Sequence, residues 1–228
     1  MTHNPFANRS KAHCNQCDGS RWHEVLFYQK DQTPGEDSRV STYELLRCAG
    51  CEEIKLRTTI LSGDDRHTST KVKPEITYYP PSTIRRQPVW FTGLMLGQLD
   101  GDVTTEYDLL REVYAALRNG APALAAMGIR AVVETVMIKK TGDNKSFEAN
   151  LTAMRDRGLV SELDVQHLRQ VLEVGHAAIH RSHLPSVEDA LRALDIAETL
   201  VKRLYLDKNT IDALKKSTPQ RRTKGDGS

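Results

Sequence analysis

Four cysteines constrain the fold of this chain more than any other feature of its sequence. They form two Cys-x-x-Cys pairs, Cys14 with Cys17 and Cys48 with Cys51, and no other cysteine is present. A Cys-x-x-Cys turn places two thiolates on one side of a tight loop, and four thiolates are a ligand set that structural Zn²⁺ prefers. The sequence therefore predicts one closed zinc site that stabilises the fold and has no open position for catalysis.

Two disulfides, or four unrelated thiols, are the alternatives to a metal site. Disulfides are rare in a reducing cytosol. The beginning of the sequence has no apolar segment behind a basic start, so we expect neither a signal peptide nor an anchor. No apolar run approaches the ~20 residues that cross a bilayer. We therefore expect a cytoplasmic protein without a membrane partner, and its net charge of +2 is too small to indicate nucleic acid by itself.

Residues 1–75 are predicted to form a small zinc ribbon around the cysteines. Aromatic and β-branched residues predict three strands, at 22–29, 41–47 and 53–60. Exposed aromatic rings can stack on nucleic-acid bases. Because a small ribbon also needs aromatic residues for its core, we assign to the core Trp22, Phe27, Tyr28 and Tyr43.

The rest of the chain shows helical periodicity. Residues 76–103 are predicted to be a linker, because Pro80 and Pro81 hold the chain extended. Residues 104–206 are predicted to form five helices that pack as a bundle. The expected helices are 104–118, 122–142, 146–157, 161–182 and 186–205. Residues 207–228 are predicted to be a disordered basic tail, either solvated or attracted to phosphate. The predicted fold class is mainly α, a five-helix bundle with a small N-terminal β zinc ribbon.

A polar stripe flanks the apolar face of the helix expected at 161–182. It contains Arg169, Glu173 and three histidines, His176, His180 and His183. In a structural interpretation, Arg169 pairs with Glu173 and the histidines fill partly buried polar positions. In a second interpretation, His176 and His180 share a metal, although the glutamate of the zinc-protease motif is missing.

In a third interpretation, the stripe cleaves RNA. A histidine can accept the proton of a ribose 2′-hydroxyl, and a guanidinium can brace the phosphate as charge builds. DNA lacks that hydroxyl, so RNA is the expected substrate. The candidate catalytic residues are Arg169, His176 and His180.

Two further features of the helical part indicate close packing. Gly175 lies inside a helix, where glycine costs about 1 kcal/mol relative to alanine, so we expect another helix or a second subunit to approach it. Arg130 and Glu134 lie four residues apart in an otherwise apolar helix, where a charged pair is costly unless hydrogen-bonded. We predict that this pair is a buried clamp, and the alternative is that it belongs to a site.

Three segments of the helical part resemble the bacterial family called domain of unknown function 4145. They are Arg111-Glu112 with the small-residue run that ends at Ala126, then Arg130-x-x-x-Glu134, and later Gly175-His176-x-x-x-His180. The family's pattern has an acidic residue in the first helix, Arg-x-x-x-Glu after a small-residue run, and Gly-Asn-x-x-x-His. The resemblance covers about residues 105–206. Cysteine pairs followed by a Tyr-Pro step also resemble frequent companions of that domain.

The resemblance implies a bundle similar to the HEPN superfamily, many of whose members are metal-independent RNases in toxin and phage-defence systems. Those enzymes use an arginine and, a few residues later, a histidine. His180 matches the motif histidine and His176 replaces the usual asparagine, but the motif arginine falls on Gly175. Arg169 keeps the spacing only in a shifted register. Such domains commonly pair, so we expect a homodimer.

Two functions follow from the residues and the resemblance. The first is an endoribonuclease that acts on RNA or other nucleic acid in a defence or toxin system. The alternative is a noncatalytic module that binds nucleic acid or a protein partner in a restriction or defence complex, since the motif arginine is missing. The sequence shows no ATP-binding loop, dinucleotide fingerprint or nucleophile elbow, which sets those enzyme classes aside.

Overall fold

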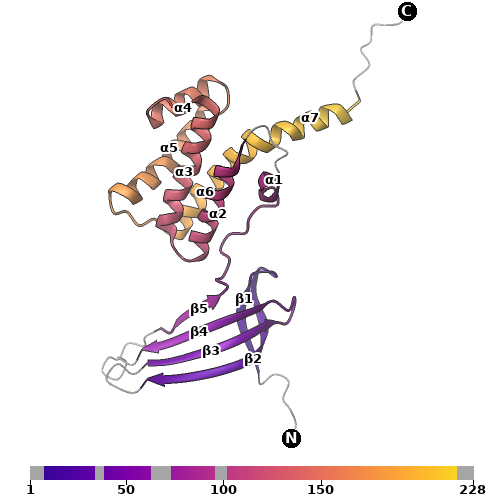
Figure 1. Cartoon of the computed structure of the whole chain (residues 1–228), viewed down its shortest axis with the longest axis vertical. Coiled ribbons are helices and arrows are strands. Elements are labelled where there is room, and N and C mark those ends of the chain that lie inside the picture. Colours follow the sequence, from indigo (N-terminus) through magenta and orange to yellow (C-terminus); the bar gives the residue numbers. More distant parts are fainter. Residues whose placement is uncertain (1–7, 34–38, 63–72, 96–101, 220–228) are drawn as a thin grey trace, which may run out of the picture. The chain divides into compact units, whose positions relative to one another are not determined.

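The computed structural model describes residues 8–33, 39–62, 73–95 and 102–219. The chain divides into two compact units, Met1–Ile84 and Arg85–Ser228. We call them the N-terminal unit and the helical unit, and each is described by itself (Figure 1). The described helices include none that is both long enough and apolar enough to span a membrane.

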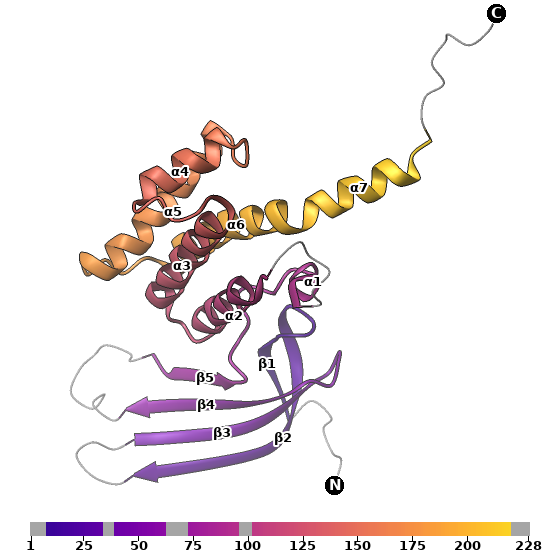
Figure 2. The ribbon, with the colours of Figure 1, turned by 45° about the horizontal axis from the view of Figure 1, so that its top comes forward.

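The N-terminal unit is a five-stranded antiparallel sheet in the order of the sequence. Its strands are β1 (Arg9–Cys14), β2 (Gly19–Thr33), β3 (Arg39–Cys48), β4 (Ile54–Ser62) and β5 (Glu75–Tyr79). The sheet curls, so that its β1 end turns out of the plane of β3, β4 and β5 (Figures 1 and 2). The expected small ribbon is therefore wrong: the three predicted strands are present but longer, and β1 and β5 were not predicted. Both are edge strands: β1 is polar and shows no strand pattern in its side chains, and β5 is a short strand directly before the prolines that were assigned to the linker.

An irregularity in β2 changes which side chains share a face of the sheet. The pairing with β3 shifts between Val25 and Phe27, so that Leu26 is an extra residue in β2. Such a bulge interrupts the alternation of side chains along a strand. As a result Trp22, before the bulge, and Phe27, after it, lie on the same face although they are five positions apart.

The core of the N-terminal unit is small and lies on one face near the cysteines. It consists of Ala12, Cys14, His23, Leu46, Cys48 and Lys55, and the one other buried residue among those described in this unit is Ser41, on the opposite face. Lys55 is held there by a hydrogen bond from its ammonium group to the carbonyl oxygen of His13. The prediction that the aromatic residues form the core is wrong for Trp22, Phe27 and Tyr28, which are exposed. With so few apolar side chains buried, the sheet needs another source of stability.

The helical unit contains more helices than predicted. They are α1 (Phe91–Met95), α2 (Thr104–Arg118), α3 (Pro122–Thr141), α4 (Phe147–Asp156), α5 (Glu162–His180), α6 (Val187–Lys202) and α7 (Lys208–Ser217), with a π-helical turn η2 (Arg203–Asp207) before α7. The five predicted helices are confirmed as α2 to α6. The predicted fold class, a mainly α five-helix bundle with a small ribbon, is nevertheless wrong. The structure also contains α1, α7 and a five-stranded sheet. Helix α1 lies in the expected linker, and α7 occupies part of the expected disordered tail, of which residues 220–228 lie outside the described part.

Helix α3 is the centre of the helical unit. It packs against α2, α4, α5 and α6, and nine of its twenty residues are buried. Serine residues cap the helices that follow it: Ser146, Ser161 and Ser186 accept hydrogen bonds from the first turns of α4, α5 and α6. Ser161 and Asp164 form the predicted capping box.

A buried carboxylate joins three elements of this unit. Glu106 of α2 is fully buried and accepts hydrogen bonds from Tyr205 Oη at 2.7 Å and from Lys139 Nζ at 2.8 Å. Burial and the hydrogen bond to Glu106 raise the pKa of Tyr205, so the phenol remains a donor. These contacts connect α2, α3 and η2.

A second buried carboxylate connects α6 to α2 and to the first residue of the helical unit. Glu198 of α6 accepts hydrogen bonds from Tyr114 Oη and Arg85 Nη2, both at 2.6 Å. Arg85 also pairs with Asp195 at 2.6 Å. In both networks the charged groups beside the apolar core have partners of opposite charge. Burial of a charge is costly without such a partner.

Candidate metal centre and candidate helical pocket

The structure brings the four cysteines together at one end of the sheet. Their sulfur atoms all lie within 4.8 Å of one another, with 3.4 Å between Cys14 and Cys51 and 3.9 Å between Cys17 and Cys48. A tetrahedron with Zn–S bonds of ~2.3 Å has sulfur atoms ~3.8 Å apart. All four are free thiols. The disulfide alternative is absent from the structure, and the geometry suits a metal ion such as zinc.

Each cysteine pair sits at a β-turn between two strands, and backbone conformation shapes both turns. Asp18 and Glu52 follow the second cysteine of their pairs and both have positive φ, 57° and 63°. Gly50 leaves room for the sulfur atoms, because a Cβ atom there would lie in tight contact with Cys17 Sγ, at 3.2 Å. The hairpins β1–β2 and β3–β4 therefore hold the four cysteines in place.

Glu53 connects the two cysteine turns and was not identified from the sequence. Its Oε2 accepts hydrogen bonds from the backbone N–H groups of Asn15 at 3.0 Å and Gln16 at 3.3 Å, and it contacts Cys14 Sγ at 3.0 Å. Burial opposes its ionisation, but these hydrogen bonds lower the pKa of Glu53 overall. The carboxylate thus ties the second cysteine turn to the first.

The thiols of the four-cysteine cluster differ in acidity. Burial raises the pKa of Cys14 to about 11. Burial also opposes ionisation of Cys48, but backbone N–H groups of Cys51 and Gly50 donate to its sulfur and lower its pKa to about 7. Because a metal binds the thiolate form, the lowered pKa of Cys48 favours the form that a metal would bind.

A pocket between α4 and α5 collects part of the predicted polar stripe. Arg169 and His176 both line this cavity of about 330 Å³, together with Arg130, Glu148 and Glu173. His180 does not line it, but its ring lies 4.5 Å from the ring of His176. Two of the three candidate catalytic residues therefore share a cavity, and the third contacts one of them.

Arg169 has a different partner from the one expected. It donates from Nε and Nη2 to the two carboxylate oxygens of Glu148 in α4, both at 2.8 Å. Glu173 instead pairs with Arg181. The structural interpretation that paired Arg169 with Glu173 is therefore wrong. Both ion pairs are exposed, so each contributes little to stability.

Arg130 is a clamp that also lines the pocket. Its Nε donates to Glu134 Oε1 at 2.5 Å and its Nη1 to the carbonyl oxygen of Leu172 at 3.3 Å. Its guanidinium carbon lies 4.0 Å from the ring centre of Phe147, close enough for a cation–π contact. The guanidinium thus connects α3 to both α4 and α5.

Gly175 allows α5 to approach α3 closely. A Cβ atom at this position would lie 2.6 Å from Arg130 Cβ and 3.0 Å from the carbonyl oxygen of Ala126. The close approach expected at Gly175 is therefore found within the chain. The homodimer that was partly based on it stays a prediction.

Gly175→Ala is expected to destabilise the helical unit by about 1–3 kcal/mol, the usual cost of forcing extra atoms into a packed contact. Urea unfolding followed by far-UV circular dichroism measures this loss. Gly93→Ala in α1 is the matched control, because its Cβ would meet Leu206 at an ordinary 3.8 Å. A Gly175→Ala protein as stable as the wild type would show that the contact is looser than described.

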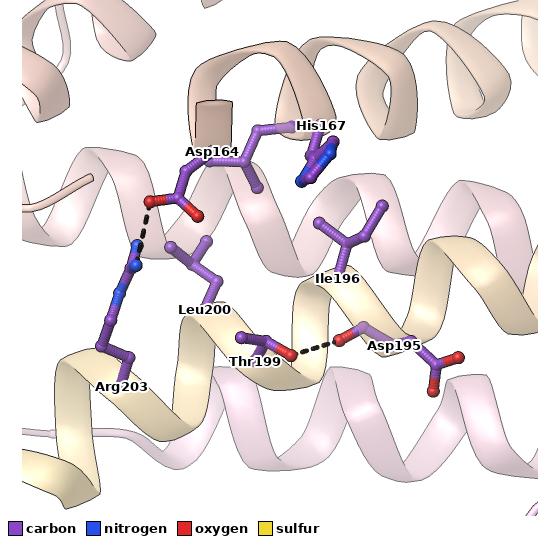
Figure 3. Close-up of a pocket in the computed structure, with 8 residues that line it drawn as sticks. Asp164, His167, Asp195, Ile196, Thr199, Leu200 and Arg203 are labelled. Carbon is purple, nitrogen blue, oxygen red and sulfur yellow. Dashed lines mark hydrogen bonds and ion pairs between the residues drawn. The ribbon is translucent and has the colours of Figure 1, made fainter. Parts of the chain in front are cut away.

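A smaller pocket lies between α5 and α6 (Figure 3). Its volume is about 180 Å³, and Leu168, Ile196 and Leu200 give it an apolar floor. At its rim Arg203 Nη1 donates to Asp164 Oδ2 at 2.9 Å, and Thr199 Oγ1 donates to the carbonyl oxygen of residue 195 at 2.8 Å (Figure 3). These polar groups serve the helices that carry them, so we assign the pocket no chemistry.

The fold and sites define a two-unit protein, with a β-sheet that carries a candidate thiolate metal centre and a helical unit that carries a polar pocket. A family described as a domain of unknown function (DUF4145) matches residues 111–224, which is half of the chain. The chain belongs to this family, as the resemblance predicted. The match runs from within α2 past α7 and does not include the sheet. No curated protein and no solved structure matches the chain.

Proposed function

We propose that the protein acts on RNA and that the pocket between α4 and α5 cleaves a phosphodiester without a metal. The convergence of Arg169 and His176 on this one cavity, with His180 against His176, supports the proposal. In this scheme His176 accepts the proton of the ribose 2′-hydroxyl, and the 2′-oxygen attacks the phosphorus. His180 gives a proton to the leaving 5′-oxygen, so the products carry a 2′,3′-cyclic phosphate and a 5′-hydroxyl.

Arg169 would brace the phosphate in this proposal. Its ion pair with Glu148 has both partners exposed, and exposed pairs are worth about 0–1 kcal/mol. A phosphate dianion or diester oxygen can therefore replace the carboxylate at little cost. Charge-assisted hydrogen bonds from an arginine to phosphate are among the stronger polar contacts in proteins.

Cleavage of labelled single-stranded RNA in the presence of a divalent-metal chelator at a concentration that leaves the protein folded tests this proposal. His176→Ala and His180→Ala should each slow cleavage by about 10²- to 10⁴-fold, the contribution of a positioned acid or base. Arg169→Ala should slow it as well, whereas Arg155→Ala, which removes another exposed arginine pair, should not. Equal rates for wild type and Arg169→Ala would exclude Arg169 as the brace.

A noncatalytic RNA-binding module is the second candidate, and one observation favours it. Both arginines at the pocket are already paired with carboxylates, and Arg130 is packed against Gly175, where the motif arginine would stand. Wild-type protein that binds RNA but leaves a broad panel of RNAs intact would establish this alternative.

For the N-terminal unit, we propose that the four-cysteine cluster holds a structural Zn²⁺. The tetrahedral spacing of the sulfur atoms and the shortage of apolar core support it. Cys14, Cys17, Cys48 and Cys51 would fill the coordination sphere, so the ion would link two hairpins and take no part in cleavage.

A further inference from the structure

One face of the sheet carries an apolar row that has an exposed aromatic ring at each end. Phe27, Leu45, Leu56 and Tyr79 lie in register across β2 to β5, the two leucines are partly buried, and the bulge in β2 adds Trp22 to the same side. We call this surface the aromatic face. Of their surfaces, Phe27 exposes 57%, Tyr79 75% and Trp22 52%. Apolar rings gathered on a surface in this way indicate a binding site.

Basic side chains lie beside these rings at the cysteine end of the aromatic face. In the pairing of β1, β2 and β3, Arg9, Glu24 and Arg47 occupy one row, and Lys11 lies opposite Trp22. Three cations therefore lie in this region with two carboxylates, Glu24 and Glu52, both of which raise the pKa of Arg47. Lys11 Nζ lies 5.1 Å from the centre of the Trp22 ring, and the Arg47–Glu24 pair is exposed, so both cations can turn to another anion at low cost.

We propose that the aromatic face binds single-stranded nucleic acid. Unpaired bases of any sequence stack on exposed aromatic rings, and neighbouring Lys and Arg side chains neutralise the phosphates. Phe27 and Tyr79 lie at opposite ends of the row, with the smaller side chains of Leu45 and Leu56 between them. Each ring can therefore stack on a different base. The centres of protein–protein interfaces are depleted of charge, whereas this surface has cations beside its rings.

The aromatic face belongs to the N-terminal unit and the pocket between α4 and α5 to the helical unit, and this proposal stands whether or not that pocket cleaves RNA. It does give nucleic acid a second contact on the same chain. Membership of the family does not imply this proposal, because the family match does not include the sheet.

Fluorescence anisotropy of the full chain, zinc-loaded, with a short labelled oligouridylate tests the proposal. Phe27→Ala and Tyr79→Ala should each weaken binding by about 5- to 100-fold, as expected for loss of one stacked base. Tyr28→Ala is the matched control: Tyr28 is the next residue in β2, is 54% exposed and pairs with Glu44 on the opposite face. Its affinity should equal that of the wild type.

Three further results complete the test. Phe27→Trp should retain binding, which shows that a ring and not a fold is lost in Phe27→Ala. Lys11→Gln should reduce the slope of log affinity against log salt by about 0.7, one phosphate contact on a single strand. Arg155→Ala, which removes an exposed arginine pair in the helical unit, should leave affinity unchanged. Absence of binding by the wild type, or equal losses in Phe27→Ala and Tyr28→Ala, would each overturn the proposal.

Discussion

Removal of metal from the four-cysteine cluster is expected to unfold the N-terminal unit and to leave the helical unit folded. The sheet buries few apolar side chains, so its stability should depend on ligation. Structural zinc sites contribute about 10–16 kcal/mol of apparent binding free energy in small domains. Protein purified under reducing conditions should contain one Zn²⁺ per chain by elemental analysis. After chelation, the strand signal in far-UV circular dichroism should be lost while the helical signal remains.

Two variants separate ligation from other causes of unfolding. Cys48→Ser should lose zinc and the strand signal, whereas Ser20→Ala, an exposed position in β2 outside the cluster, should keep both. Zinc added back to the chelated wild type should restore the sheet. Purified protein without zinc, or a sheet that survives chelation unchanged, would contradict the metal centre.

Glu106→Gln is expected to destabilise the helical unit by about 2–4 kcal/mol. Breaking a buried ion pair by removing one partner typically costs 3–5 kcal/mol, and Lys139 is partly exposed, which reduces the loss. Glutamine keeps the size of the side chain, but it removes the charge that faces Lys139 and presents an N–H group toward another donor. Such a change lowers the folding equilibrium constant by roughly 30- to 1,000-fold.

Urea unfolding followed by the helical signal measures this change. Glu188→Gln is the matched control, because Glu188 belongs to an exposed pair with Arg192 at the start of α6. It should change the free energy of unfolding by less than about 0.5 kcal/mol. Similar effects of the two substitutions would show that the Tyr205–Glu106–Lys139 network is not a specific source of stability.

The cysteine spacing and the helical periodicity were enough to predict the four-cysteine cluster and helices α2 to α6. Both signals are local: a Cys-x-x-Cys turn and a serine cap such as Ser161 act within one turn of chain. The polar stripe on α5 was also visible. The partner of Arg169 was not, because Glu148 lies in another helix and only the packing of α4 on α5 brings the two together.

The size of the sheet and the side chains on its faces could not be read from the sequence. Strand β1 is polar, and its pairing with β2 depends on backbone hydrogen bonds. The aromatic residues were assigned to a core because exposed and buried rings have the same local pattern. The shift at Leu26 then places Trp22 and Phe27 on one face, although regular alternation would place them on opposite faces.

That extra residue has a consequence for comparing this chain with related ones. Before Leu26 the even-numbered residues of β2 point toward the aromatic face, and after it the odd-numbered residues do. A homologue of the same composition but one residue shorter here would turn either Trp22 or Phe27 to the side that holds His23 and Leu46. The length of β2 at this point, rather than the identity of the aromatic residues, therefore decides whether a homologue has the aromatic face.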